Sequence, residues 1–188
     1  MGLSDAKRYI SELLKKQSDP YQWPDFLTGL PDRAAINAKL KEVYPKIDSH
    51  CVFYFRIKNI HPYLAKYGTK KHVELIQWAA AILKTNADKV GGFVGTINTH
   101  DFVAICKKVE YEDFELSVRN EFQKKARTFY SDEDVKNGTV ISFSNGSHLH
   151  KVGLMHFACA SSMETDSLPI ELIIPTLEKR CTAREKEA

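Results

Sequence analysis

Two short apolar runs around a polar tip constrain the fold of this 188-residue chain most strongly. The runs are 93–97 (Phe-Val-Gly-Thr-Ile) and 102–106 (Phe-Val-Ala-Ile-Cys), and the tip between them is Asn98-Thr99-His100-Asp101. Each run has the length of one strand and is rich in β-branched and aromatic residues, so the pattern predicts a β-hairpin. Its tip would place a carboxylate and an imidazole at a sheet edge, and an ordinary polar turn is the competing interpretation.

The remaining patterns predict an α+β fold, in which helices flank one mixed central sheet and a small extra β-hairpin stands beside it. The first half of the chain should form a helix at 4–17, a structured turn at 25–33, a helix that Asp32 caps and that has the apolar stripe Ile36, Leu40 and Val43, a nearly continuous apolar strand at 51–57 and a turn at 66–68. A helix with apolar residues at Val73, Ile76, Ala80 and Leu83 should follow and end near Asn86, before the hairpin at 93–106 and a helix marked by Phe114, Val118, Phe122 and Phe129. The last elements should be a short strand at 139–143 between the turn signals Asn137-Gly138 and Asn145-Gly146, a strand at 151–160, and a terminal helix from Pro169 that Pro175 kinks or delimits.

The length suits one folded domain with a substantial core. We assign residues 20–188 to this domain and residues 1–19 to a leading helix and linker. That helix is too short to bury its apolar stripe alone. It therefore either packs back on the domain or continues a stalk that lies upstream.

Composition excludes several classes of function. The 27 Lys and Arg against 24 Asp and Glu leave a net charge of only +3, which is too balanced to indicate a nucleic-acid-binding protein. No apolar run is long enough to insert in a membrane, and the start has no signal-peptide pattern. The four cysteines fall in no CxxC spacing, so we expect buried free thiols and a cytoplasmic location.

The stretch Asp25-Phe26-Leu27-Thr28-Gly29-Leu30-Pro31-Asp32-Arg33 resembles D-x-L-T-G-L-P-N-R, the opening signature of GGDEF domains, with Asp32 in place of the usual Asn. The strand at 51–57, the Tyr67-Gly68 pair, the hairpin and the last strand follow in the order of that family. The resemblance covers residues 20 to 180. It implies a nucleotidyl-cyclase-like fold and a place in bacterial cyclic di-GMP signalling, where diguanylate cyclases condense two GTP molecules.

The resemblance also implies which positions would carry the chemistry, beginning with the carboxylates that hold two Mg²⁺ ions in the family. The first of these positions is Arg56, the next acidic position is Lys58, and the central acid of the signature is His100. At an effective dielectric of about 20, two unit charges about 4 Å apart interact by about 4 kcal/mol. A cation at the first position would therefore repel a divalent ion, and we expect neither a bound metal nor a cofactor.

The other family positions are altered as well. The guanine-reading Asn and Asp correspond to Leu64 and Ala65, whose side chains form no hydrogen bonds. The signature falls on Asn98-Thr99-His100-Asp101-Phe102, so side chains replace the two glycines that approach the phosphate. The inhibitory product site maps to Lys89 and Gly92, which keep one basic group and lose the carboxylate.

Several further candidates compete with plainer interpretations. Arg56 and Lys58 could accept an anion such as a nucleotide phosphate, but we expect an internal salt bridge from Arg56 to Asp101 instead. His100 and Asp101 form a solvent-facing turn more readily than an acid–base pair, because no nucleophile is identifiable. His148 and His150 could bind a transition metal, but no third ligand stands at a recognisable spacing. We expect Trp23 and Trp78 to pack in the core or at the domain edge and not to hold a ligand.

These observations predict a catalytically inactive GGDEF-like signalling module that acts by contact with a protein partner. The alternative is a non-catalytic receptor for GTP or cyclic di-GMP. An active diguanylate cyclase is the least favoured hypothesis, because the metal and guanine-reading positions would all have to be dispensable.

Overall fold

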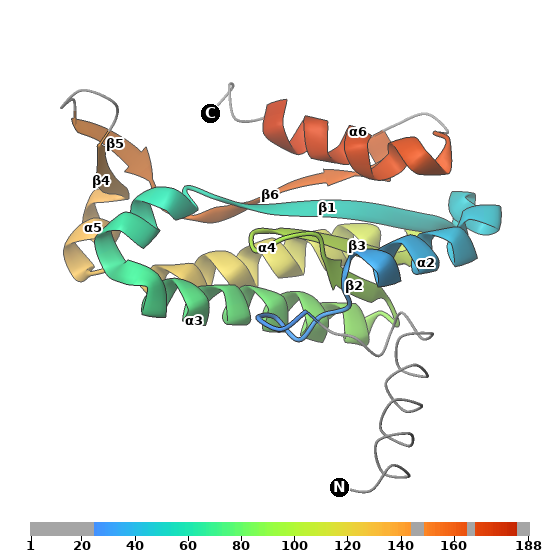
Figure 1. Cartoon of the computed structure of the whole chain (residues 1–188), viewed down its shortest axis with the longest axis horizontal. Coiled ribbons are helices and arrows are strands. Elements are labelled where there is room, and N and C mark those ends of the chain that lie inside the picture. The colour runs from blue at the N-terminus through green and yellow to red at the C-terminus, as the bar shows by residue number, and fades with distance from the viewer. Residues whose placement is uncertain (1–24, 144–148, 165–167, 184–188) are drawn as a thin grey trace, which may run out of the picture.

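A computed structural model of the chain describes residues 25–143, 149–164 and 168–183 (Figure 1). The expected helix at 4–17, Trp23 and His148 lie outside these residues. In chain order the described elements are α2 (Arg33–Val43), η1 (Tyr44–Ser49), β1 (His50–Lys58), α3 (Ile60–Lys89), β2 (Phe93–Thr96), β3 (Asp101–Lys107), η2 (Lys108–Glu110), α4 (Tyr111–Arg127), α5 (Asp132–Asn137), β4 (Thr139–Phe143), β5 (Leu149–Gly153), β6 (His156–Ser161), η3 (Ser162–Glu164) and α6 (Ile170–Ala183).

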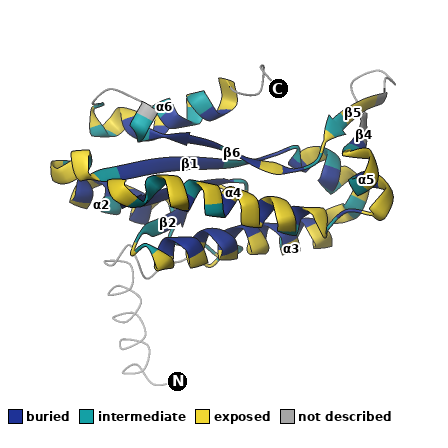
Figure 2. Ribbon diagram, turned by 180° about the vertical axis from the view of Figure 1, so that it is seen from behind, coloured by how far each residue is buried: buried dark blue, intermediate teal, exposed yellow. Residues whose placement is uncertain are grey.

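A central sheet in the strand order β2-β3-β1-β6 separates the helices into two layers, and β4 and β5 pair in a small sheet of their own. In Figure 1, α6 lies above the central sheet and α3 and α4 lie below it. Figure 2 shows that β1 is buried for most of its length, whereas the helices expose their outer surfaces. The α+β fold with helices flanking a central sheet and a small extra hairpin is therefore confirmed.

Strand alternation in β1 divides the core between the two layers. Phe53 and Phe55 pack with residues of α3 and α4, while Val52 and Tyr54 pack with residues of α2 and α6. Arg56 continues the second series, so its side chain lies on the α6 side of the sheet.

The opening motif forms a tight turn that docks against the edge of the sheet. The Asp25 carboxylate accepts hydrogen bonds from the backbone amides of Leu27 and Thr28, and Gly29 has a positive φ of 68°. Next, Pro31 accepts a hydrogen bond at its carbonyl from the Thr96 amide in β2. Asp32 then caps α2 as predicted, by accepting a hydrogen bond from the Ala35 amide.

The strand directions differ from the prediction. Every described pair in the central sheet is antiparallel, whereas the sequence predicted a mixed sheet. The neighbour of β1 is β3, the second strand of the hairpin, and not β2. Because the chain reverses direction at the 98–101 tip, β3 runs antiparallel to β1.

The predicted strand at 151–160 is wrong as one element. It is two strands, β5 and β6, in different sheets. Between them the Met155 amide donates to the Tyr130 hydroxyl, and the Leu154 carbonyl accepts from the Asn59 side chain. These two bonds replace ladder bonds, so the chain leaves one sheet before it joins the other.

The predicted turn at 66–68 is a break inside α3. Gly68 has φ 82° and ψ 170°, so helical segments continue on both sides of a change in direction. The segment before Gly68 was not predicted as helix, although Pro62 suits a first helical turn. Pro175 likewise lies inside α6 and does not end it.

Two further predictions concern burial. Cys51, Cys106, Cys159 and Cys181 are all buried free thiols, as predicted. Trp78 is half-exposed on α3, where the Lys125 ammonium lies 3.8 Å from the centroid of its ring, so it packs at the edge of the domain. No helix of the described part of the chain is long and apolar enough to cross a membrane.

Candidate functional site

A cavity of about 590 Å³ lies where β1 ends and the β2–β3 tip approaches the start of α3. Its lining comes from two short segments, 56–62 and 98–101. The end of β1 contributes Arg56 and Lys58, and the tip contributes His100 and Asp101. The structure thus brings together the residues that the resemblance associates with metal and phosphate.

The tip is an ordered turn held by the side chain of Asn98. The Asn98 Oδ1 accepts hydrogen bonds from the amides of His100 and Asp101 at 2.9 and 3.0 Å. Its Nδ2 donates to the Asp101 carboxylate at 2.5 Å, and the Thr96 hydroxyl donates to the Asn98 carbonyl at 2.6 Å. Asn98 therefore uses its side chain to close the turn, in the manner of an Asx turn.

Arg56 and Asp101 form the expected salt bridge. They are cross-strand partners in β1 and β3, and Arg56 donates from Nε and Nη2 to the two Asp101 carboxylate oxygens at 2.5 and 2.9 Å. This is the two-pronged arrangement that a guanidinium favours with a carboxylate. Asp101 is accordingly the first residue of β3, with its side chain buried, and not a solvent-facing tip residue as predicted.

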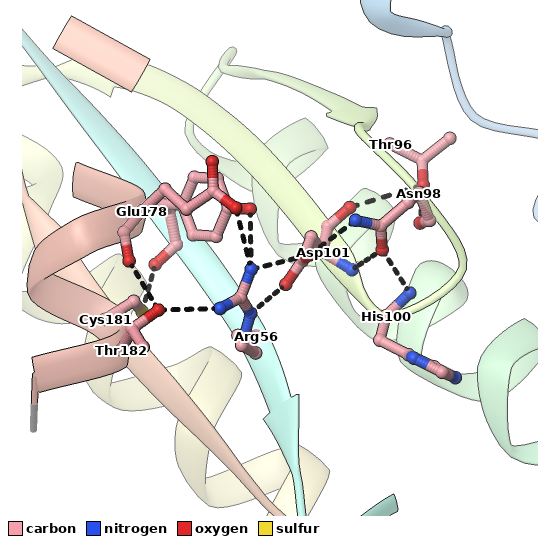
Figure 3. A network of polar contacts seen from close by, with 9 residues as sticks. Arg56, Thr96, Asn98, His100, Asp101, Glu178, Cys181 and Thr182 are labelled. Carbon is pink, nitrogen blue, oxygen red and sulfur yellow. Dashed lines mark hydrogen bonds and ion pairs between the residues drawn. The ribbon is translucent and has the colours of Figure 1, made fainter. Parts of the chain in front are cut away.

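Helix α6 completes the network around Arg56 (Figure 3). The guanidinium donates to Glu178 at 3.1 Å and to the Thr182 hydroxyl at 2.8 Å. It also donates to the Tyr54 hydroxyl at 3.3 Å. Arg56 thus links both strands to the terminal helix.

The ionisation of the network follows from these contacts. Burial alone would raise the pKa of Asp101, but the hydrogen bonds from Arg56 and Asn98 outweigh it and hold the pKa below its usual value. The hydrogen bond to Asp101 is also the main reason that the pKa of Arg56 is raised. Both groups therefore remain charged at neutral pH.

This arrangement does not fit a pair of magnesium ions. Magnesium prefers carboxylate and other oxygen ligands in octahedral geometry. Asp101 is the one carboxylate among the described residues that line the cavity, and both of its oxygens are engaged by Arg56. The Arg56 guanidinium is a permanent cation. A dication at this place would have to displace the guanidinium and then remain beside it.

Other predicted site residues lie elsewhere. Leu64 is half-buried and Ala65 exposed on α3, and neither is among the described residues that line the cavity. Lys89, at the far end of α3, donates to Glu121 at 3.4 Å. Gly92 precedes β2, at the opposite end of that strand from the tip. The structure therefore gathers the metal and phosphate positions at the cavity, and the guanine-reading and inhibitory positions lie elsewhere.

The sequence did not predict the histidines that surround His100. The ring points away from the Arg56 network, as Figure 3 shows. Its Nε2 lies 2.9 Å from Nε2 of His72 in α3, and the ring of His61 stands edge-on to it. Glu178 and Thr182 were missed as well. No spacing pattern identifies such partners, because tertiary packing brings them together.

No family model and no curated protein matches the sequence. Solved structures do match it. The coiled coil and GGDEF domain of DgcB from Caulobacter crescentus, in complex with c-di-GMP, is 14% identical with a TM-score of 0.65, over 99% of this chain and 93% of that one.

Two further structures show the same likeness. The diguanylate cyclase SiaD from Pseudomonas aeruginosa, in complex with its activator SiaC, is 11% identical with a TM-score of 0.65, over 99% of this chain and 66% of that one. The active GGEEF domain of a diguanylate cyclase from Vibrio cholerae is 10% identical with a TM-score of 0.55, over 84% of this chain and 92% of that one. The chain therefore has the fold of the GGDEF domains of diguanylate cyclases, as its opening motif and order of elements predicted.

Proposed function

We propose that this chain is a catalytically inactive GGDEF-like module of a bacterial signalling system, which acts by contact with a protein partner. The observation that carries the proposal is the ion pair of Arg56 with Asp101. It stands at the place where the resemblance puts a metal-binding carboxylate.

The positive charge of Arg56 opposes the metal-dependent phosphoryl transfer that a diguanylate cyclase performs. Such transfer depends on divalent ions that neutralise the phosphates and position the reacting oxygens. Arg56 brings one positive charge of its own and forms ion pairs with two carboxylates of the protein, Asp101 and Glu178. These contacts engage both oxygens of Asp101, which a metal ion would need as ligands.

Recognition of guanine would also lack its usual donors and acceptors. Leu64 and Ala65 stand at the guanine-reading positions that the resemblance implies, and their side chains cannot replace a lost hydrogen bond. An unsatisfied buried polar group costs about 1–3 kcal/mol. Substrate binding and metal binding are therefore weakened by independent changes.

Contact with a protein is supported by the surface and by one of the structural neighbours. Trp78 in α3, Leu116 in α4 and Leu172 in α6 each expose about half or more of the side chain, at 47%, 61% and 50%. SiaD carries the same fold and was solved in complex with its activator. A role through protein contact needs no turnover at the cavity.

The second candidate is a receptor for GTP or cyclic di-GMP that leaves its ligand unchanged. The cavity beside the tip favours it, because about 590 Å³ is a suitable size for a small ligand. The DgcB structure, solved with c-di-GMP, shows that the fold can hold this dinucleotide.

Two measurements separate these functions. Incubation with GTP and Mg²⁺ should yield no cyclic di-GMP, and robust synthesis would overturn the proposal. Calorimetric titration with GTP and with cyclic di-GMP should give no heat of binding, whereas saturable binding in the micromolar range would favour the receptor.

A double substitution tests whether the loss has more than one cause. We expect Arg56→Asp with His100→Asp to restore no synthesis, because Leu64 and Ala65 still fail to bind guanine. Recovery of synthesis in this variant would show that the two metal positions alone determine activity.

A further inference from the structure

The first part of α3 is a short helix between two positions with left-handed backbone. Asn59, which precedes it, has φ 59° and ψ 24°, and Gly68, which ends it, has φ 82° and ψ 170°. Residues at the ends of an element can absorb a change in backbone angles and so let the element turn as a unit. We call residues 60–67 the hinged segment. In Figure 1 it lies beside α5, and the rest of α3 continues below the central sheet.

The hinged segment connects the cavity to α5. Its first residues, 60–62, line the cavity. Its last residues contact the Asp134 carboxylate in α5. Lys66 donates to both carboxylate oxygens at 2.7 Å, and the Tyr67 hydroxyl donates to one of them. The Tyr67 hydroxyl also accepts a hydrogen bond from the Ser131 amide at 2.9 Å.

We propose that the hinged segment moves as a unit about Asn59 and Gly68, and that Asp134 is the latch that keeps it closed. The structure holds the closed position. In the open position the contacts with Asp134 are broken and residues 60–62 leave the wall of the cavity. The device therefore couples contacts at α5 to the shape of the cavity. It goes beyond the proposed function and holds whether or not the cavity binds a nucleotide.

Two features of the closed position oppose each other. The side chains of Ile60 and Tyr63 are buried in the core, and this burial of apolar surface keeps the closed position dominant. The Tyr63 hydroxyl, however, is buried and has no hydrogen-bond partner among the described residues. A buried hydroxyl without a partner costs free energy, and opening would expose it to water. The closed position therefore contains a group that favours the open one.

The latch can be weakened without leaving a hole in the core. The Asp134 side chain is 7% exposed, whereas that of its partner Lys66 is 41% exposed. Asparagine has the same shape as aspartate but carries no charge, and only one of its two terminal atoms can accept a hydrogen bond. Asp134→Asn thus weakens the contacts with both Lys66 and Tyr67 at once.

Backbone hydrogen exchange of the full chain, followed by NMR in increasing urea below the unfolding transition, tests the movement. A helix of this length is not stable when it is detached, so opening should expose the amides of residues 64–67 together. These four amides should share one opening equilibrium, about tenfold or more above that of the amides of β1, with a weaker dependence on urea.

Two outcomes in the unaltered protein would overturn the proposal. If residues 64–67 exchanged with the opening equilibrium and urea dependence of β1 at every urea concentration, the segment would open only with the whole domain. Four different opening equilibria for these amides would indicate fraying of the helix and not movement of a unit.

Two variants should change the opening in opposite directions. Asp134→Asn should speed the exchange of residues 64–67 by about tenfold, because it weakens hydrogen bonds to a charged group. Tyr63→Phe should slow it severalfold, because phenylalanine keeps the ring and removes the unsatisfied hydroxyl. Asp88→Asn is the matched control, since it breaks an exposed pair with Lys84 in the second part of α3 and should leave this exchange unchanged. Unchanged exchange in Asp134→Asn, or faster exchange in Tyr63→Phe, would contradict the proposal.

Discussion

Replacement of Arg56 by Met tests the internal ion pair most sharply, because Met keeps much of the length of the side chain and removes the charge. The Asp101 side chain is only 5% exposed, so its carboxylate would stay buried with hydrogen bonds from the side chains of Asn98 and Tyr54 alone. Removal of one partner of a fully buried ion pair lowers the free energy of unfolding by about 3–5 kcal/mol. The Arg56 side chain is 20% exposed, and water can partly replace it. We therefore expect a loss of about 2–3 kcal/mol in the free energy of unfolding.

Urea denaturation followed by circular dichroism measures this loss and shows whether it belongs to the pair. Asp101→Asn should cost less, about 1–2 kcal/mol, because Arg56 keeps Glu178 and reaches solvent. In the double variant the two losses should not add, and the coupling energy should be at least about 1 kcal/mol.

The exposed pair of Lys39 with Glu42 provides the matched control, since its side chains are 27% and 60% exposed. Lys39→Met should change stability by less than about 0.5 kcal/mol. A similarly small effect of Arg56→Met, or additive losses in the double variant, would show that the pair of Arg56 with Asp101 does not stabilise the fold.

Three further predictions concern other parts of the fold. Burial would raise the pKa of Asp134, but hydrogen bonds from Lys66 and Tyr67 outweigh it and lower the pKa. The stability lost in Asp134→Asn should therefore be constant above about pH 5 and should disappear as the pH falls from 3.8 through the lower pKa of the folded state. Denaturation across this pH range measures the loss, and a loss that grew on acidification would contradict the prediction. A Cβ added at Gly95 would lie 2.6 Å from the side chain of Ile36, so Gly95→Ala should cost about 1–3 kcal/mol in thermal or urea unfolding, and an unchanged midpoint would show that α2 does not press on β2. Loss of the helix cap in Asp32→Ala should cost about 1 kcal/mol in the same assay, and Asp32→Asn should restore most of it.

The parts of the fold that follow local rules could be predicted from the sequence. Alternating apolar runs and a polar tip identified β2 and β3, and the cap at Asp32 located the start of α2. The salt bridge of Arg56 with Asp101 was predictable too, because a cation beside the tip required a compensating anion. These features depend on residues that are close in sequence or that face each other on neighbouring strands of the sheet.

The remainder depends on contacts between distant segments. The split of 151–160 into β5 and β6 depends on hydrogen bonds to Tyr130 and Asn59, which no local pattern contains. The contacts of Arg56 with Glu178 bridge 122 positions of the chain. The approach of His72 to His100 likewise requires the break at Gly68 and the closed tip at once.

We have proposed that the Arg56 guanidinium occupies the place of a metal-binding carboxylate. A crystal structure grown with GTP and Mn²⁺ tests it directly, because manganese can be located by its anomalous scattering. We expect Arg56 to remain bonded to both oxygens of Asp101, with no manganese coordinated by that carboxylate. Two manganese ions beside the Asp101 carboxylate, with the guanidinium turned away and a nucleoside triphosphate bound to them, would show that the protein keeps a working metal site.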